Sequence, residues 1–167
     1  MLVNFLTLGE VRHAVNTAAI DPKVLSSLHG YLNVAYRLGL LLAQWHTGGT
    51  SACTLEYRGE VTKKDTRLLT SAFCAGLLER ALEEEANIVN AQVLLRERGI
   101  ELVEQSRSEM GAFRSSVQAE IIADGRAYVA GGTLFGNDMP RLVRLGEYRL
   151  EAYLDGILLI FMHDDIP

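Results

Sequence analysis

The residues best suited to chemistry lie in segment 129–145, where several glycines precede two arginines. The segment predicts a strand, a glycine-rich turn over Gly131–Gly136, and a second strand that carries Arg141 and Arg144. Glycine lets backbone N–H groups approach an anion closely, and an arginine can neutralise that anion. The pattern therefore indicates anion recognition rather than a reaction centre. The predicted contacts are Gly131, Gly132, Thr133, Arg141 and Arg144.

The same segment also has a purely structural interpretation. It lacks the Gly-Lys-Ser/Thr of a P-loop, and it does not open a helix as a dinucleotide-binding motif does. A bulge and a tight turn would need the glycines without any ligand. Arg141, Arg144 and Arg149 could protect an edge strand against aggregation. Because Arg141 and Arg144 are three residues apart, we expect them on opposite faces of a strand, so that at most one contacts a given ligand.

The other candidates for chemistry form no catalytic constellation. No two histidines have the i, i+4 spacing of a helical metal site. They lie scattered at His13, His29, His46 and His163. Ser51 and Ser71 lack the flanking glycines of a nucleophile elbow. We therefore expect neither a catalytic residue nor a metal site.

Composition is typical of one globular domain. The chain has 167 residues, of which 49% are hydrophobic and 22% charged, enough to bury a core. Its net charge of −5 argues against general binding to nucleic acid or to anionic membranes. No signal peptide or membrane span is evident, and Cys53 and Cys74 are predicted to be buried thiols in a reducing compartment. We expect a cytoplasmic protein.

The order of elements predicts the fold class. Helical spacing of apolar residues predicts helices over 22–42, from 62–66 to 82, and over 91–97. Alternation and turn residues predict strands over 50–61, 100–105, 115–123, 126–131, 142–145, 148–153 and 157–162. Helices interspersed with one strand and followed by a run of antiparallel strands indicate an α+β fold. We expect one mixed sheet with helices packed on one face.

Several short motifs, taken in order, resemble one enzyme family. They are Phe5–Asn16, Tyr57–Glu60, Gly76–Glu79, Asn87–Ala91, Arg96–Ile100 and Ala130–Gly136. Together they resemble the C-terminal regulatory part of long-form D-3-phosphoglycerate dehydrogenases, which act in serine biosynthesis. In that family the region is an intervening, or allosteric substrate-binding, domain between the NAD-dependent catalytic part and an ACT domain.

The resemblance implies how the chain is divided. Residues 1–10 would be the end of the last helix of the catalytic part, and residues 11–156 the intervening domain. Residues 157–167 would be the first strand of a truncated ACT domain. Both ends of the sequence fit this interpretation, because 1–8 is apolar without a helix cap and few residues follow the predicted strand at 157–162. The chain is thus expected to be an excised segment.

The resemblance also implies a function. The segment would self-associate and would bind an anionic effector or a phosphorylated hydroxy acid, so that it modulates an active site elsewhere in the full-length chain. Arg141 matches the basic position that the family has after its glycine-rich turn. The segment itself is expected to be non-catalytic and to hold no cofactor, while NAD would serve the parent enzyme.

Two other functions remain open at this point. The chain could be a purely structural module that pairs subunits without a ligand, since a long apolar helix and exposed edge strands suit self-association. It could also be the related domain of a bacterial L-serine dehydratase. Residues 6–16 favour the dehydrogenase, because they match the junction found in that family.

Overall fold

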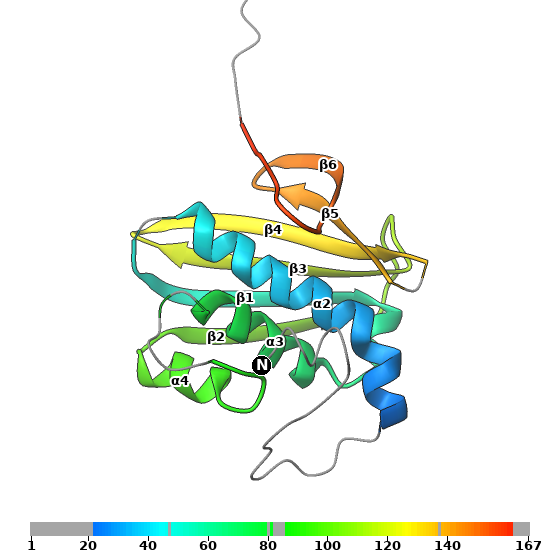
Figure 1. Ribbon diagram of the computed structural model, residues 1–167, viewed down its shortest axis with the longest axis horizontal. Coiled ribbons are helices and arrows are strands. Elements are labelled where there is room, and N and C mark those ends of the chain that lie inside the picture. The colour runs from blue at the N-terminus through cyan, green and yellow to red at the C-terminus, as the bar shows by residue number, and fades with distance from the viewer. Residues whose placement is uncertain (1–21, 47, 80, 82–85, 137, 162–167) are drawn as a thin grey trace, which may run out of the picture.

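The computed structural model describes residues 22–46, 48–79, 81, 86–136 and 138–161. The elements are α2 (Pro22–Trp45), β1 (Thr50–Gly59), the 3-10 helix η1 (Glu60–Lys63), α3 (Thr66–Leu78), α4 (Ala91–Glu97), β2 (Glu101–Arg107), β3 (Ser115–Ala123), β4 (Arg126–Phe135), β5 (Met139–Leu145) and β6 (Tyr148–Tyr153). Within this described part, six strands form one sheet in the order β2-β1-β3-β4-β5-β6 (Figure 1). Among these helices, none combines the length and the apolar character that crossing a bilayer requires.

The sheet is mixed, as predicted. Strand β1 pairs with β2 in parallel, whereas the pairs from β1–β3 to β5–β6 are antiparallel. A parallel pair needs a long crossover connection, which here contains α3 and α4. Strands β3 to β6 then follow one another as an antiparallel meander. The predicted α+β class with a single mixed sheet is confirmed.

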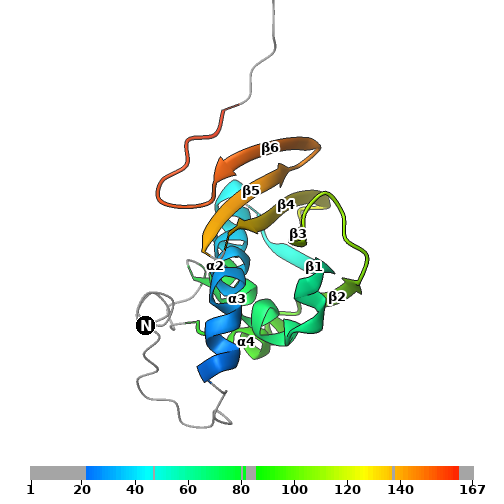
Figure 2. The ribbon, with the colours of Figure 1, turned by 90° about the vertical axis from the view of Figure 1, so that its right-hand side faces the viewer.

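The helices cover one face of the sheet. Helix α2 crosses β3, β4 and β5, and α3 lies alongside α2 (Figures 1 and 2). The Tyr57 hydroxyl of β1 and the Thr70 hydroxyl of α3 are 2.7 Å apart, which ties α3 to the sheet. We call the opposite surface of the sheet the open face, because these helices do not cover it.

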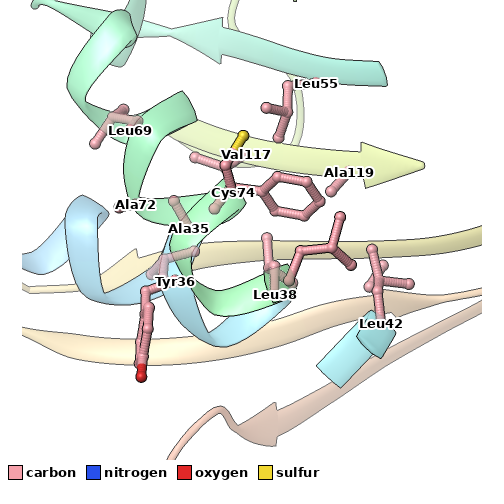
Figure 3. Packing of buried hydrophobic residues seen from close by; sticks show 14 of the residues in the cluster. Ala35, Tyr36, Leu38, Leu42, Leu55, Leu69, Ala72, Cys74, Val117 and Ala119 are labelled. Carbon is pink, nitrogen blue, oxygen red and sulfur yellow. The ribbon is translucent and has the colours of Figure 1, made fainter. Parts of the chain in front are cut away.

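Alternation along the central strands builds the core. In β1 and β3 every second side chain is buried against the helices, including Leu55, Tyr57, Val117 and Ala119. Figure 3 shows these strands facing residues of α2 and α3 such as Leu38. The side chains between them point to the open face, so the sheet has one apolar and one polar side, as an antiparallel sheet covered on one side should.

Helices α2 and α3 cross in direct backbone contact at two glycines. A Cβ atom at Gly39 would lie 2.2 Å from the Phe73 carbonyl oxygen, and one at Gly76 would lie 2.1 Å from the Tyr36 carbonyl oxygen. Near this crossing, the Tyr36 hydroxyl donates a hydrogen bond to the Glu79 carboxylate. The two glycines thus set how closely the helices approach.

Several predicted boundaries agree with the structure and others differ. The elements predicted over 91–97, 115–123 and 148–153 have the observed bounds. Helix α3 ends at Leu78 rather than at 82, and β5 begins at Met139 rather than at 142. The predicted tail over residues 1–10 lies outside the described residues.

The strand predicted over 157–162 is not formed in residues 157–161, the part that is described. Its apolar side chains are exposed, with Ile157 at 100%, Leu159 at 88% and Phe161 at 74% of full accessibility. A strand forms by pairing, and in the described chain β6 is the last strand of the sheet on this side. The assignment of residues 157–167 to a further domain stays a prediction.

Both cysteines should be unreactive in the folded protein. Cys53 and Cys74 are unpaired and buried, and burial raises the pKa of each thiol to about 12. Because the thiolate is the reactive form, we expect no modification by an aromatic disulfide reagent at pH 8, and modification of both thiols after unfolding. Thiol burial should favour folding below pH 9, and this contribution is lost as the pH rises toward 12. Rapid labelling of the native protein would contradict the assignment.

Candidate anion-binding site

A row of four polar side chains, interrupted by one glycine, crosses the open face of the sheet. The strand register places Glu56, Gln118, Gly131, Arg144 and Arg149 next to one another, on β1, β3, β4, β5 and β6. Each pair of neighbours in this row lies on the same side of the sheet. The predicted residues Gly131 and Arg144 are thus in the middle of the polar surface, although they are distant from Glu56 in sequence.

Gly131 and Gly132 lie inside β4, so the turn predicted over 131–136 is wrong. The strand continues to Phe135, and the chain turns at Gly136, which has a φ of +64°. The two glycines instead make room for neighbouring side chains. A Cβ atom at Gly131 would lie 3.1 Å from Arg144 Cβ, and one at Gly132 would lie 2.7 Å from Val34 Cγ1 of α2. Gly131 therefore faces the open side and Gly132 faces the helices.

Arg141 and Arg144 both lie on the open face, contrary to the expectation from their spacing. Gly132 pairs with Leu142 and Gly131 pairs with Arg144, which leaves Val143 as an extra residue in β5. This β-bulge shifts the alternation by one residue, and such a shift moves the following side chains to the other face. The bulge is the physical reason that the opposite-face prediction is wrong.

Arg141 is enclosed by its own neighbours. Its side chain is 7% exposed, and its Cζ lies 3.5 Å from the ring centroid of Tyr153 and 5.3 Å from that of Phe135. Its Nη1 donates to the Pro140 carbonyl oxygen at 3.3 Å, and its Nε lies 3.7 Å from Glu151 Oε1. Stacking on two rings and pairing with a carboxylate stabilise a buried guanidinium.

Thr133 is also buried, and it lies opposite Arg141 in the sheet. Its Oγ1 donates to the Ser115 carbonyl oxygen at 2.5 Å. Both residues stay predicted contacts for an anion, but neither lines the groove in which Arg144 lies.

Arg144 is half-buried and lines a groove on the open face. Its Nε donates to the Gly146 carbonyl oxygen at 3.0 Å, and its Nη1 donates to Gln118 Oε1 at 2.7 Å. Both acceptors are uncharged, so they orient the guanidinium without neutralising it. The groove has a volume of about 470 Å³ and is lined by Gly131 and Gly132 as well. Such a volume lies within the usual range of small-molecule sites.

The sequence-based list missed two arginines at the other end of this groove. Arg58 of β1 and Arg107 of β2 are register neighbours, and both line the groove. Glu56 Oε1 lies 3.7 Å from Arg58 Nε and 3.4 Å from Arg107 Nε. Alternation in β1 already placed Arg58 on the polar side of that strand. No short sequence pattern could predict that Arg58 lies beside Arg107, because β1 and β2 are far apart in the sequence and become neighbours only in the folded sheet.

The groove is positively charged within an acidic chain. Arg149 and Glu147 complete the set of charged residues that line it. Four arginines and two glutamates line the groove, so its lining carries an excess of positive charge, whereas the whole chain has a net charge of −5. An arginine keeps its charge at any physiological pH and can hold a carboxylate or phosphate with two parallel hydrogen bonds. The arrangement can bind an anion.

Comparisons with known proteins identify related sequences. A family model described as the D-3-phosphoglycerate dehydrogenase intervening domain matches residues 27–146. Relatives named D-3-phosphoglycerate dehydrogenase include one from Archaeoglobus fulgidus, 27% identical over 99% of this chain and 31% of the relative. One from Synechocystis sp. is 29% identical over 93% of this chain and 28% of the relative. One from Methanocaldococcus jannaschii is 30% identical over 95% of this chain and 30% of the relative. The chain spans about three tenths of the length of these relatives.

Proposed function

We propose, since the chain belongs to the family of the D-3-phosphoglycerate dehydrogenase intervening domain, that it is a regulatory segment of a longer dehydrogenase. The parent would be an NAD-dependent enzyme of serine biosynthesis, and its active site would be formed by another part of the longer protein. This segment would bind an anionic effector, or the phosphorylated hydroxy acid that the relatives' name specifies, and would modulate that active site. The family match favours the dehydrogenase over the serine dehydratase alternative.

The observation that carries this proposal is the placement of Arg144. Its guanidinium lines a groove of suitable volume, and its two hydrogen-bond acceptors there are neutral. The groove therefore offers the positive charge of Arg144. Neighbouring residues hold this guanidinium in place, and no carboxylate among the described residues forms an ion pair with it. An anion of a metabolite would supply the missing partner.

The groove suits binding rather than catalysis. Most of its charged residues are arginines, which cannot exchange a proton near neutral pH and so cannot act as general acids or bases. Binding alone can regulate an enzyme if it favours one conformation of the whole protein over another. Gly131 and Gly132 offer a connection, because one borders Arg144 and the next borders Val34 of α2.

Replacing Arg144 with alanine should weaken this regulation in the full-length enzyme. A hydrogen bond to a charged group contributes about 1.5–3 kcal/mol, so the effector concentration needed for half the response should rise roughly tenfold or more. Initial rates measured over a wide range of D-3-phosphoglycerate, with and without inorganic phosphate, would show the shift. Arg126→Ala is a matched control, because Arg126 is exposed and does not line the groove. An unchanged response in the Arg144 variant would contradict the proposal.

A second candidate is a structural module that pairs subunits. The exposed apolar side chains of Ile157, Leu159 and Phe161, together with the exposed Tyr148 and Tyr153 of edge strand β6, favour self-association. This role predicts a concentration-dependent dimer in sedimentation experiments. It would replace the regulatory role if neither Arg141→Ala nor Arg144→Ala altered the response of the full-length enzyme.

A further inference from the structure

We propose that the Asp155–Gly156 pair is a site of spontaneous protein modification, at which the aspartate converts to isoaspartate through a succinimide ring. The pair lies directly after β6, where the chain leaves the sheet (Figure 1). The inference goes beyond the proposed function and does not depend on anion binding, because it concerns a covalent change in the main chain. It also specifies which of the two Asp-Gly pairs in the sequence reacts.

The reaction needs only these two residues and water. The Gly156 amide nitrogen bonds to Cγ of the protonated Asp155 carboxyl group, and one carboxyl oxygen leaves as water, carrying the acid proton and the amide proton. Water then opens the ring. Cleavage of the new N–Cγ bond restores aspartate, whereas cleavage of the original peptide bond leaves the main chain running through the side-chain carbonyl, which is isoaspartate. The overall change is an isomerisation and requires no oxidant or metal.

The folded chain brings the reacting atoms together. The Gly156 backbone nitrogen donates a hydrogen bond to Asp155 Oδ1 at 2.8 Å, so the nitrogen lies close to the carboxyl carbon that it would attack. The Asp155 side chain is 65% exposed, which gives water access to the ring. Around Gly156 there is open space, because a Cβ atom there would meet nothing within 4 Å. Proximity, solvent and room for the ring therefore coincide at this pair.

The main chain at Asp155 can also rotate at low cost. Ring closure changes the backbone torsions of the aspartate, because Cγ must swing toward the next amide nitrogen. The last backbone hydrogen bond before the site joins the Leu154 nitrogen to the Pro140 carbonyl oxygen at 3.1 Å. Residues 155–160 belong to no helix or strand of the described chain. Rotation at Asp155 therefore breaks no part of the sheet.

The other pair, Asp124–Gly125, is held in a conformation that opposes ring closure. It forms the two-residue turn between β3 and β4, and the residues on either side of it pair directly with each other. Both turn residues have a positive φ, +49° and +73°, as a type I′ turn requires. A Cβ atom at Gly48 would lie 1.5 Å from Asp124 Oδ2, so this carboxylate packs against the backbone of Gly48. Rotation at Asp124 would disrupt the hairpin.

Arg37 of α2 slows the reaction at Asp155 without preventing it. Its Nη2 lies 2.7 Å from Asp155 Oδ1, and its Nε donates to Asn33 Oδ1 at 2.6 Å, which holds the guanidinium on the helix. The ion pair stabilises the carboxylate, whereas an oxygen can leave as water only from the protonated acid. Ion pairs between exposed side chains are weak, so this restraint is partial.

Conversion would change how the chain leaves the domain. Isoaspartate adds one methylene group to the main chain and displaces the carboxylate from Arg37. The segment that follows borders a groove beside α2, and its half-buried Leu158 packs against the core. Loss of the ion pair and a longer main chain would loosen residues 157–160 from the helix.

Mass spectrometry of the 167-residue chain tests the inference after incubation at pH 6 in water labelled with heavy oxygen. Each aspartate that has passed through the ring gains one heavy oxygen, and fragmentation by electron transfer distinguishes isoaspartate from aspartate. In the folded chain we expect Asp155 to react at least about tenfold faster than Asp124, because reaction at Asp124 requires local opening of the hairpin. In urea the two pairs should react at similar rates.

Variants test the role assigned to Arg37. Arg37→Met should accelerate the reaction at Asp155 by up to about fivefold, because it removes the ion pair. Arg37→Lys keeps the charge and should have a smaller effect. Arg98→Met removes an exposed positive charge outside this region and should change neither rate. Gly156→Ala should slow the reaction, since a side chain hinders approach of the nitrogen to Cγ.

Three results would contradict this account. If Asp155 gained no heavy oxygen in the folded chain, the ring could not close there and the inference would be overturned. Equal rates at Asp155 and Asp124 in the folded chain would overturn the selectivity that the fold is said to impose. An unchanged rate in Arg37→Met would overturn the restraint assigned to the ion pair. None of these measurements involves a ligand, so the proposed function is tested separately.

Discussion

Replacing Gly76 with alanine should lower the free energy of unfolding by about 3 kcal/mol or more, because the added methyl group has no space between α2 and α3. Its Cβ would lie 2.1 Å from the Tyr36 carbonyl oxygen and 3.1 Å from the Leu40 amide nitrogen. Both contacts are with backbone, so no side-chain rotation can relieve them. The helices would have to move apart, and residues buried between them and the sheet would lose contacts.

The sign of this effect is informative. In a helix interior alanine is favoured over glycine by about 1 kcal/mol, so without the close contact the substitution should stabilise the chain. Urea unfolding followed by circular dichroism would measure the change. Gly49→Ala is a suitable control, because a Cβ atom there meets nothing within 4 Å and its φ is not positive. A Gly76 variant as stable as this control would show that the helices do not cross as described.

Gly132→Ala should destabilise the chain by about 1–3 kcal/mol, whereas Gly131→Ala should have a smaller effect on stability. The new methyl group at Gly132 would lie 2.7 Å from Val34 Cγ1, which belongs to the closely packed core under α2. At Gly131 the nearest atom would be Arg144 Cβ at 3.1 Å, on the open face. The overlap at Gly131 is smaller than the overlap at Gly132, so a shift of a few tenths of an ångström is enough to relieve it.

Substitutions at these two adjacent glycines together test which face of β4 each residue occupies. Thermal unfolding of the two variants should give clearly different midpoints, with the Gly132 variant lower. Gly131→Ala should instead weaken binding of a phosphate ligand, because it displaces Arg144. Equal losses of stability would imply that both residues contact the core, and the assignment of Gly131 to the open face would then be wrong.

The local periodicity of apolar residues was sufficient to predict many of the helices and strands. The strand over 115–123 could be predicted to the residue because its side chains alternate between buried and half-buried without interruption. The short helix over 91–97 could be predicted because Gly99, with a φ of +73°, ends it. In both cases the signal lies within a few residues along the chain, where sequence patterns are informative.

The site depends on contacts that no local pattern contains. Arg58 and Arg107 become neighbours only when β2 returns beside β1 after the α3–α4 crossover. Gly131 and Gly132 could be recognised as unusual residues, but their role depends on Arg144 and Val34, which approach from another strand and from a helix. The sequence thus predicted that this segment matters and that Arg144 belongs to it, while the partners of Arg144 had to come from the tertiary structure.

The bulge at Val143 also affects how relatives of this domain should be compared. One additional residue in β5 decides whether the arginine after it lies toward the open face or toward the helices. Point substitution cannot move a side chain between these faces, whereas the gain or loss of a single codon can. An alignment that places a gap within β5 would therefore match residues from opposite sides of the sheet. Homology across this strand is better judged by strand length and register than by residue identity at one column.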